Sequence, residues 1–374
     1  MIRLLAVLLF LLPLAARADA PPPPPVAAKS WLLMDVTSGQ TIASQNPNER
    51  VEPASLTKLM TAYLVFNALK EKKIQPTQPV NISERAWKMG GSRMFVEPRK
   101  PVTVDELLRG MIVQSGNDAT VALAETVAGS EEVFAQMMNK EAARLGLKDT
   151  SFTNSTGWPD PKLYSTATDL ARLAAALIRD FPEQYAALYS LKEYRYNNIS
   201  QPNRNRLLWL DPNVDGVKTG HTEAAGYCLI ASAKRSDRRL LSVVLGTASD
   251  SARAQESQKL LNYGFQFYDT VRLFDATKPV GTVRVWKGAE NEVGAGVLSD
   301  LYITVPRGEA DKLKADFVSR QPLVAPLSAG QPVGSIRVTL DGKPFGEYQA
   351  VAMKSVPVAG FFGRLADTVR LWFK

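Results

Sequence analysis

The chain has 374 residues, of which 45% are hydrophobic, so it can bury a sizeable catalytic domain and a smaller second domain. Its formal net charge of +8 favours anionic polymers or phospholipid surfaces as partners. The single cysteine, Cys228, excludes an internal disulfide, and the single histidine, His221, leaves no Cys/His cluster for a metal ion. We therefore expect neither a metal nor a cofactor.

Residues 1–18 have the pattern of a signal peptide. Arg3 precedes a short apolar run over residues 4–16, and Ala16-Arg17-Ala18 offers a small-x-small cleavage site. The run is shorter than the ~20 residues that span a bilayer, and a retained anchor is the alternative. An exported chain excludes nucleic acid as a partner. Residues 19–28 contain five consecutive prolines and predict a stiff polyproline spacer outside the fold.

Residues 29–268 predict a catalytic domain of the α/β (α+β) class. Strands are expected at residues 29–36 and within 228–245, and periodic helical segments, including 130–145 and 168–178, lie between them. This order predicts a central antiparallel sheet with a helical lobe, and an active-site cleft between the two.

The motif Ser55-Leu-Thr-Lys58 opens a predicted helix that runs to Leu69, with Pro53 at its start. On such a helix Ser55 and Lys58 share one face, one turn apart. The helix dipole disfavours a cation near its N-terminus, and burial beside Lys218 would disfavour it further. Lys58 is therefore expected to be the neutral amine that a general base must be. An ordinary amphipathic helix with a surface lysine is the alternative.

Ser115-Gly-Asn117 follows an apolar stretch and precedes a helix predicted from Asp118, so the motif is expected to form a loop between helices. We expect Ser115 to relay a proton between Lys58 and a leaving group. Asn117 is expected to hydrogen-bond the peptide backbone of a substrate. A capping turn is the alternative, because Ser and Asn suit helix starts, and the two roles can coincide.

Lys218-Thr219-Gly220 leads into a strand predicted at residues 227–233, which pairs as an antiparallel hairpin with residues 240–245. At the start of that strand the lysine and the threonine would offer a cation and a hydroxyl to an anionic substrate. Gly220 would let a ligand approach the backbone. A peptide can add along such a strand edge. A basic strand end without function is the alternative.

Residues 269–356 predict a small β-domain. Short alternating runs at residues 283–286, 301–305, 333–338 and 348–352 are separated by turns that contain Gly, Pro or Asp. No nucleophile motif occurs in this part, so a stalk or a protein-binding module is its expected role.

Residues 357–374 predict an amphipathic helix at the end of the chain. The segment is short and contains charged residues, so we expect it to lie on an anionic membrane surface and not to cross the bilayer. A helix packed on the protein's own core is the alternative. The apolar positions that share one helix face are Phe361, Phe362, Leu365, Val369, Trp372 and Phe373.

The three motifs stand in the order that is the signature of penicillin-binding proteins and class A β-lactamases. The chain has one histidine and no G-x-S-x-G elbow, so a Ser-His-Asp triad is not expected. Longer blocks resemble low-molecular-mass penicillin-binding proteins of the D-alanyl-D-alanine carboxypeptidase type, peptidase family S11, from about residue 28 to the end. These blocks are Glu52–Thr61, Val113–Ala119, Ser165–Ala171, Asn213–Thr222 and Lys259–Phe265.

The resemblance implies a role for each motif. Ser55 is the acyl-ester nucleophile and Lys58 its general base, while Ser115 and Asn117 form the second motif. Lys218 with Thr219 would anchor the substrate.

Two further residues gain a role from the resemblance. Arg253 matches an arginine that helps to hold a terminal carboxylate. His221 follows K-T-G as in that family, where we expect it to support or tune the site. The oxyanion hole would use backbone N–H groups of Ser55 and of the strand that carries His221 and Thr222.

The sequence thus predicts an exported serine DD-carboxypeptidase at the periplasmic face of the cytoplasmic membrane. It would remove the terminal D-alanine from peptidoglycan pentapeptides, and β-lactam antibiotics would inhibit it covalently. The alternatives are a β-lactamase, a DD-endopeptidase or a catalytically weak cell-wall scaffold. Class A β-lactamases activate their deacylating water with an E-x-x-L-N element, and none occurs between Ser115 and Lys218, so fast penicillin turnover is not expected.

Overall fold

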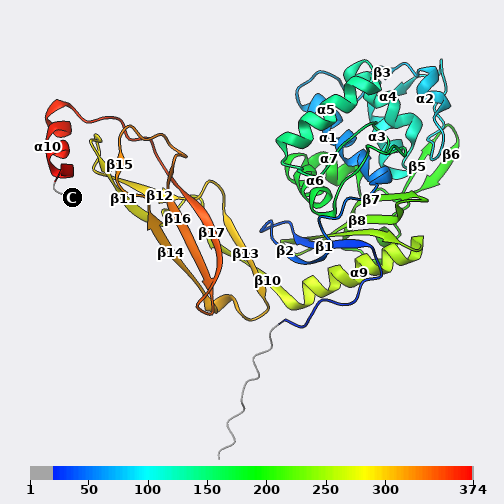
Figure 1. The fold of residues 1–374 in the computed structure, drawn as a ribbon. Coiled ribbons are helices and arrows are strands. Elements are labelled where there is room, and N and C mark those ends of the chain that lie inside the picture. Colours follow the sequence, from blue (N-terminus) through cyan, green and yellow to red (C-terminus); the bar gives the residue numbers. More distant parts are fainter. Residues whose placement is uncertain (1–19, 373–374) are drawn as a thin grey trace, which may run out of the picture.

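The computed structural model describes residues 20–372, and the predicted signal peptide lies outside them. The described chain forms a rounded body that contains a sheet and most of the helices, followed by an elongated β-body with the last helix at its far end (Figure 1). The predicted α/β class, with its antiparallel sheet, helical lobe, small β-domain and terminal helix, is confirmed.

The first body is built on a five-stranded antiparallel sheet with the strand order β2-β1-β9-β8-β7. Strand β7 therefore forms one edge of the sheet. The strands are β1 (Ser30–Asp35), β2 (Thr41–Gln45), β7 (Val214–Thr222), β8 (Gly226–Arg235) and β9 (Arg238–Thr247). Two small hairpins accompany the sheet: β3 (Pro79–Val80) with β4 (Val102–Thr103), and β5 (Glu193–Tyr196) with β6 (Ile199–Pro202).

Helices cover both faces of this sheet. Helix α9 packs on one face, against β1, β8 and β9, and the helical lobe covers the other face (Figure 1). Because both faces of the sheet are covered, β8 and β9 each contain six consecutive buried residues, most of them apolar. The lobe contains η1 (Ala54–Thr57), α1 (Lys58–Lys70), α2 (Glu84–Lys88), α3 (Val104–Val113), α4 (Asn117–Ala128), α5 (Glu131–Arg144), α6 (Ala167–Asp180), α7 (Pro182–Leu188) and α8 (Leu207–Leu210); α9 is Asp250–Phe267.

The second body is almost entirely β-structure. Strands β10 and β13 pair with each other, and the other strands form a six-stranded sheet in the order β14-β16-β17-β12-β11-β15. Its elements are β10 (Tyr268–Phe274), β11 (Gly281–Trp286), β12 (Glu292–Gly296), β13 (Leu301–Pro306), η2 (Ala310–Lys312), β14 (Leu313–Ser319), β15 (Leu323–Val324), β16 (Pro332–Leu340), β17 (Lys343–Ala352) and α10 (Phe361–Trp372). Val356 and Val358 still form bridges with this body, so the terminal helix begins only at Phe361.

Two local predictions need correction, and one helix was not predicted. The proline-rich segment is not outside the fold, because Tyr263 Oη and Lys259 Nζ on α9 donate hydrogen bonds to the carbonyls of Pro21 (2.7 Å) and Pro25 (3.0 Å). The K-T-G motif lies inside its own edge strand, β7, and not at the start of the strand that follows it. The unpredicted helix is α9, where the sequence shows only the block Lys259–Phe265.

A buried carboxylate joins the two bodies. Asp35, fully buried at the end of β1, accepts hydrogen bonds from Arg238 Nε (2.7 Å) and from Thr270 Oγ1 (2.5 Å) on β10. Beside it, Ser38 Oγ and Thr304 Oγ1 lie 2.6 Å apart, which links the first body to β13. A buried carboxylate is stable only when it is paired in this way, so Asp35 holds the junction together.

Asp35→Ala should therefore destabilise the protein strongly, because it leaves the half-buried Arg238 guanidinium without its carboxylate. Breaking a buried ion pair costs about 3–5 kcal/mol of unfolding free energy. Denaturant unfolding followed by fluorescence would measure the loss, and limited proteolysis would locate it at the junction. Asp237→Ala, in the exposed turn between β8 and β9, is the control. Equal stability of the two variants would contradict this account.

Candidate active site

Ser55 lies in the short 3-10 helix η1, directly before α1. Ala54, the residue before it, has a left-handed backbone conformation with φ of 47°, which is uncommon for a residue with a side chain. The turn can form because Gly157 packs against it: a Cβ on Gly157 would lie 1.8 Å from the Ala54 carbonyl oxygen. Glycine is thus required at 157, and the segment around it sets the position of the Ser55 turn.

Lys58 is the first residue of α1, and its side chain is almost completely buried. Its Nζ lies 2.9 Å from Ser55 Oγ, 2.8 Å from Asn117 Oδ1 and 2.6 Å from the Thr156 carbonyl oxygen. Burial lowers the pKa of Lys58 to about 7, and the nearby Arg204 cation acts in the same direction. A substantial fraction of Lys58 is therefore uncharged at neutral pH.

Ser115 stands in the predicted loop between α3 and α4, and Asn117 is already the first residue of α4, one residue before the predicted helix start. Ser115 adopts a left-handed conformation with φ of 64°, and its Oγ accepts a hydrogen bond of 2.9 Å from Lys218 Nζ. Asn117 uses both ends of its amide, since Oδ1 accepts from Lys58 and Nδ2 donates to the Gly90 carbonyl at 2.8 Å. In this structure Asn117 thus orients Lys58.

Strand β7 brings the third motif to the other side of the cleft. Lys218 is buried, and this burial, together with the charge of Lys58, holds its pKa well below the usual lysine value. Gly220 packs against the Ser55 turn, where a Cβ would lie 3.1 Å from the Pro53 carbonyl oxygen. Because Gly220 has no side chain, the turn that carries Ser55 can pack against β7 at this point. The sequence did not predict this need for a glycine at residue 220.

A pocket of about 850 Å³ opens over these residues. All three motifs contribute to its lining, through Ser55, Ser115, Asn117, Thr219 and Gly220. His221 is exposed at the pocket, with its ring 4.1 Å from that of Tyr227. Across residues 20–372, no three His, Cys, Asp or Glu side chains lie close enough together to hold a metal ion.

Comparison with known proteins identifies the family. Residues 16–249 match the peptidase S11 family, described as D-alanyl-D-alanine carboxypeptidase, and residues 268–358 match the C-terminal domain of penicillin-binding protein 5. The chain belongs to the peptidase S11 family. It is 46% identical over 356 residues to D-alanyl-D-alanine carboxypeptidase DacC of Escherichia coli (strain K12). The matched region covers 93% of this chain and 89% of that protein.

Solved structures of related proteins agree with this assignment. The structure of penicillin binding protein 5 from Haemophilus influenzae is 44% identical, with a TM-score of 0.85, and the match covers 90% of this chain and 99% of that one. Penicillin-Binding Protein D2 from Listeria monocytogenes, in the ampicillin-bound form, is 28% identical with a TM-score of 0.61, over 66% of this chain and 100% of that one.

In this S11 peptidase Arg253 is more deeply buried than a residue whose expected role is to bind a terminal carboxylate needs to be. The residue is buried on α9 and forms an ion pair with Asp250. Its Nη1 donates to the Gly220 carbonyl at 3.2 Å, and its Nη2 lies 3.5 Å from the Arg204 carbonyl. In this structure Arg253 therefore supports β7 through the Gly220 carbonyl, and it also lines the pocket.

Sequence analysis missed Arg204 as a site residue. Its side chain is exposed at the pocket, and its charge lowers the pKa of both Lys58 and Lys218. The only local signal is the run Asn203-Arg204-Asn205-Arg206 after a short hairpin, which does not differ from an ordinary polar loop. Trp158, which is also exposed at the pocket, lies in no motif and was missed as well.

Gly157→Ala tests the packing of the serine turn. The added Cβ would collide with the Ala54 carbonyl, so the turn must shift, and a 1 Å misplacement of a reacting group costs about 10²-fold in rate. The rate of labelling by a fluorescent penicillin measures this loss. Gly129→Ala is a matched control, because Gly129 has a similar φ of 80° but nothing within 4 Å of the added Cβ. Equal labelling of the two variants would show that the contact at residue 157 is unimportant.

Proposed function

We propose that this protein is a serine-type D-Ala-D-Ala carboxypeptidase that removes the terminal D-alanine from peptidoglycan pentapeptides. It forms an acyl-enzyme on Ser55 and binds penicillin covalently at the same residue. One observation carries the proposal: the Nζ of a buried lysine with a pKa of about 7 lies 2.9 Å from a serine Oγ that opens onto a pocket. Membership of the S11 family supports it.

Lys58 is proposed as the base for acylation. A neutral lysine has two N–H groups and one lone pair. Asn117 Oδ1 and the Thr156 carbonyl can only accept, so they take the two N–H groups. The lone pair is then left for the Ser55 hydroxyl proton. Ser55 Oγ attacks the carbonyl carbon between the two D-alanines, and backbone N–H groups of Ser55 and of β7 at His221 stabilise the oxyanion.

Ser115 is proposed to give its hydroxyl proton to the departing D-alanine amine and to take from Lys58 the proton that Lys58 removed from Ser55. Its hydroxyl accepts from Lys218 Nζ, so its own proton can point into the pocket. The C–N bond then breaks, free D-alanine leaves, and the tetrapeptide remains as an ester on Ser55. Water, deprotonated by Lys58, attacks this ester, and Ser55 Oγ regains a proton as the tetrapeptide is released.

The terminal carboxylate of the substrate is proposed to lie beside Thr219. The buried Arg253 guanidinium makes this end of the pocket electropositive, and it acts mainly by holding the Gly220 carbonyl. Arg204 adds an exposed guanidinium at the pocket. The pocket therefore combines a hydroxyl and cationic groups, which are suitable partners for a carboxylate.

Ser55→Ala should abolish both D-alanine release and covalent penicillin binding, because no other hydroxyl lies against Lys58 Nζ in the described contacts. Lys58→Ala should lose about 10²–10⁴-fold in rate, the usual effect of removing a general base. Release of D-alanine from a diacetyl-Lys-D-Ala-D-Ala peptide, and mass spectrometry of the penicillin adduct, are the measurements. Ser251→Ala, an exposed serine on α9, is the control. An adduct that persists in Ser55→Ala would overturn the assignment.

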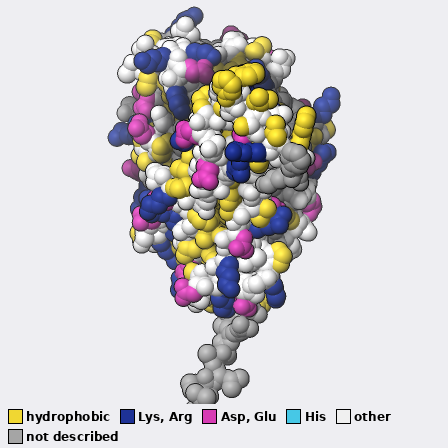
Figure 2. All heavy atoms as spheres, turned by 90° about the vertical axis from the view of Figure 1, so that its left-hand side faces the viewer, with side chains coloured by type: hydrophobic (Ala, Val, Ile, Leu, Met, Phe, Trp, Pro, Cys, Tyr) yellow, Lys and Arg dark blue, Asp and Glu magenta, His cyan; other side chains and the backbone are white. Residues whose placement is uncertain are grey.

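We also propose that the mature protein is exported and held at the periplasmic surface of the membrane by α10. Among the described helices, none is long and apolar enough to span a bilayer. Five large apolar side chains of α10 are exposed, among them Phe362 at 83% and Trp372 at 81%. Hydrophobic side chains gather on the upper part of the face at this end of the molecule, with Lys and Arg side chains nearby (Figure 2).

The opposite side of α10 is attached to the β-body. Asp367 is buried on that side, and its Oδ2 accepts a hydrogen bond of 2.7 Å from the Lys287 backbone N–H. This contact holds the helix with Phe362 and Trp372 facing outward. Exposed aromatic side chains together with basic residues such as Arg364 and Arg370 suit an anionic lipid interface.

A chain that ends at Gly360 should remain folded and active on small peptides but lose binding to vesicles of phosphatidylglycerol and phosphatidylethanolamine. Sedimentation with the vesicles measures binding, and added salt should weaken it by screening the basic residues. Phe362→Asp should act like the truncation, whereas Leu298→Asp, at an equally exposed apolar residue on the β-body, should not. Undiminished sedimentation of the truncated chain would contradict the proposal.

A further inference from the structure

Glu131 is a buried carboxylate in the first turn of α5, outside the three motifs. Its Oε1 accepts two hydrogen bonds from Ser155, at 3.0 Å from the backbone N and 2.6 Å from Oγ. Its Oε2 lies 2.6 Å from Arg85 Nη2 on α2. Both carboxylate oxygens therefore have partners. Oε1 accepts only from Ser155, the residue directly before Thr156.

That segment is in direct contact with the candidate base. The carbonyl of Ser155 accepts from Thr61 Oγ1 on α1 at 2.6 Å, and the carbonyl of Thr156 accepts from Lys58 Nζ at 2.6 Å. The next residue is Gly157, which packs under the Ser55 turn. Glu131 therefore holds the piece of backbone that contacts both the candidate base and the turn of the candidate nucleophile.

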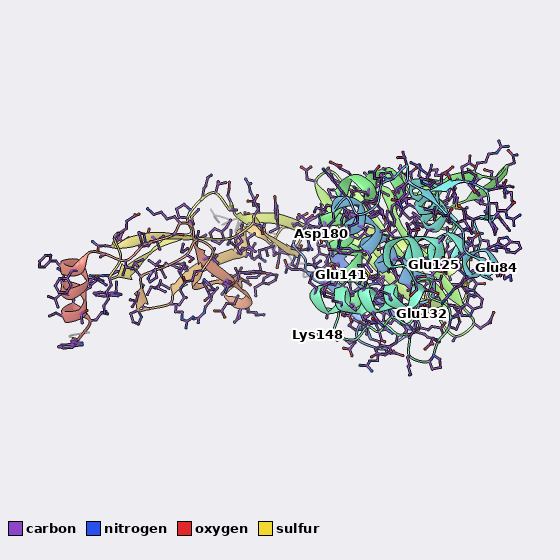
Figure 3. All side chains as sticks on the ribbon, turned by 90° about the horizontal axis from the view of Figure 1, so that it is seen from above. Glu84, Glu125, Glu132, Glu141, Lys148 and Asp180 are labelled. Carbon is purple, nitrogen blue, oxygen red and sulfur yellow. The ribbon has the colours of Figure 1, made fainter. Side chains whose placement is uncertain are left out.

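A role in stability alone does not explain this arrangement. A negative charge in the first turn of α5 favours the helix, but Glu132 already supplies one there. Glu132 also pairs with the same arginine, with its Oε1 near Arg85 Nη1, and its side chain is 64% exposed. In Figure 3 Glu132 is on the helical lobe among other acidic side chains such as Glu125. Glu131 differs from it in being buried and bonded to Ser155.

We propose that Glu131 is a positioning residue for the reaction, which holds the Ser155–Thr156 backbone so that Thr156 directs Lys58 toward Ser55. This inference rests on the proposed function, in which Lys58 is the base. Glu131 touches neither Ser55 nor Lys58 directly in the described contacts, so it acts through the Thr156 carbonyl.

Its charge adds an electrostatic effect. The charged groups that act on Lys58 are Asp118 on α4, Glu131 on α5 and Arg204 beside the pocket. The buried Lys218 on β7 is affected in turn, because the charge of Lys58 lowers its pKa. The two carboxylates raise the pKa of Lys58 against the lowering by burial and Arg204. Catalysis needs neutral Lys58, so acylation should rise with pH through about 7 and then level off. Removing the Glu131 charge should lower this pKa and move the rise to lower pH.

The test is the pH profile of the second-order rate constant for acylation of the full chain by a fluorescent penicillin. Glu131→Ala loses both the contact with Ser155 and the charge, so the plateau of acylation should fall about 10²-fold and the rise should move to lower pH. Glu131→Gln keeps an oxygen for Ser155 but not the charge, so its plateau should recover close to that of the parent, with the rise at lower pH. Glu132→Gln, which leaves Ser155 untouched, should keep both the plateau and the profile.

The outcomes separate this inference from the proposed function. If Glu131→Ala and Glu131→Gln are acylated as fast as Glu132→Gln, with the same pH profile, Glu131 does not position the base and the inference fails while the function stands. If the parent chain forms no adduct at Ser55, the function itself fails. Should Glu131→Ala not fold, Glu131→Gln still decides through its pH profile, and an unshifted rise would overturn the inference.

Discussion

The burial of one lysine determines most of this active site. Lys58 lies where water cannot solvate an ammonium, so its pKa falls to about 7, and three oxygens within 2.9 Å fix its direction. Each oxygen comes from a different part of the chain. Because an unpaired polar group in this position would be costly, the three parts must come together for the helical lobe to close. Formation of the site and packing of the lobe are thus coupled.

Backbone conformation supports the same geometry. Ala54 and Ser115 both have left-handed φ values, and each stands at or beside one of the candidate catalytic hydroxyls. Such conformations cost of order 1–3 kcal/mol each and persist only where the surroundings enforce them. The glycines at 157 and 220 provide the room, since each packs against the turn of Ser55. At these two positions the strain accompanies the hydroxyls of Ser55 and Ser115, which line the pocket.

The active-site body and the outward face of α10 lie at opposite ends of the molecule, with the β-body between them (Figure 3). The network at Asp35 joins β1 to β10 and thereby keeps the two bodies in line. Asp367 has the corresponding role at the other end, where it orients α10 on the β-body. Asp35 thus connects the active-site body to the β-body, and Asp367 connects the β-body to α10. Both carboxylates have these partners because a buried charge is stable only when it is paired.

The sequence alone determined the class of the fold, the order of its domains and the candidate site residues Ser55, Lys58, Ser115 and Lys218, because periodicity and short motifs are local properties. It did not reveal α9 as a helix, the separate strand β7, or the roles of Glu131 and Arg204. Lys58 contacts Asn117 across 59 residues and Thr156 across 98, and Glu131 lies 24 residues from Ser155. Contacts over such distances leave no periodic trace in the sequence. Only the closing of the helical lobe on the sheet decides which carboxylate is buried and which arginine faces the pocket. It also decides that Lys58 is buried beside Ser55.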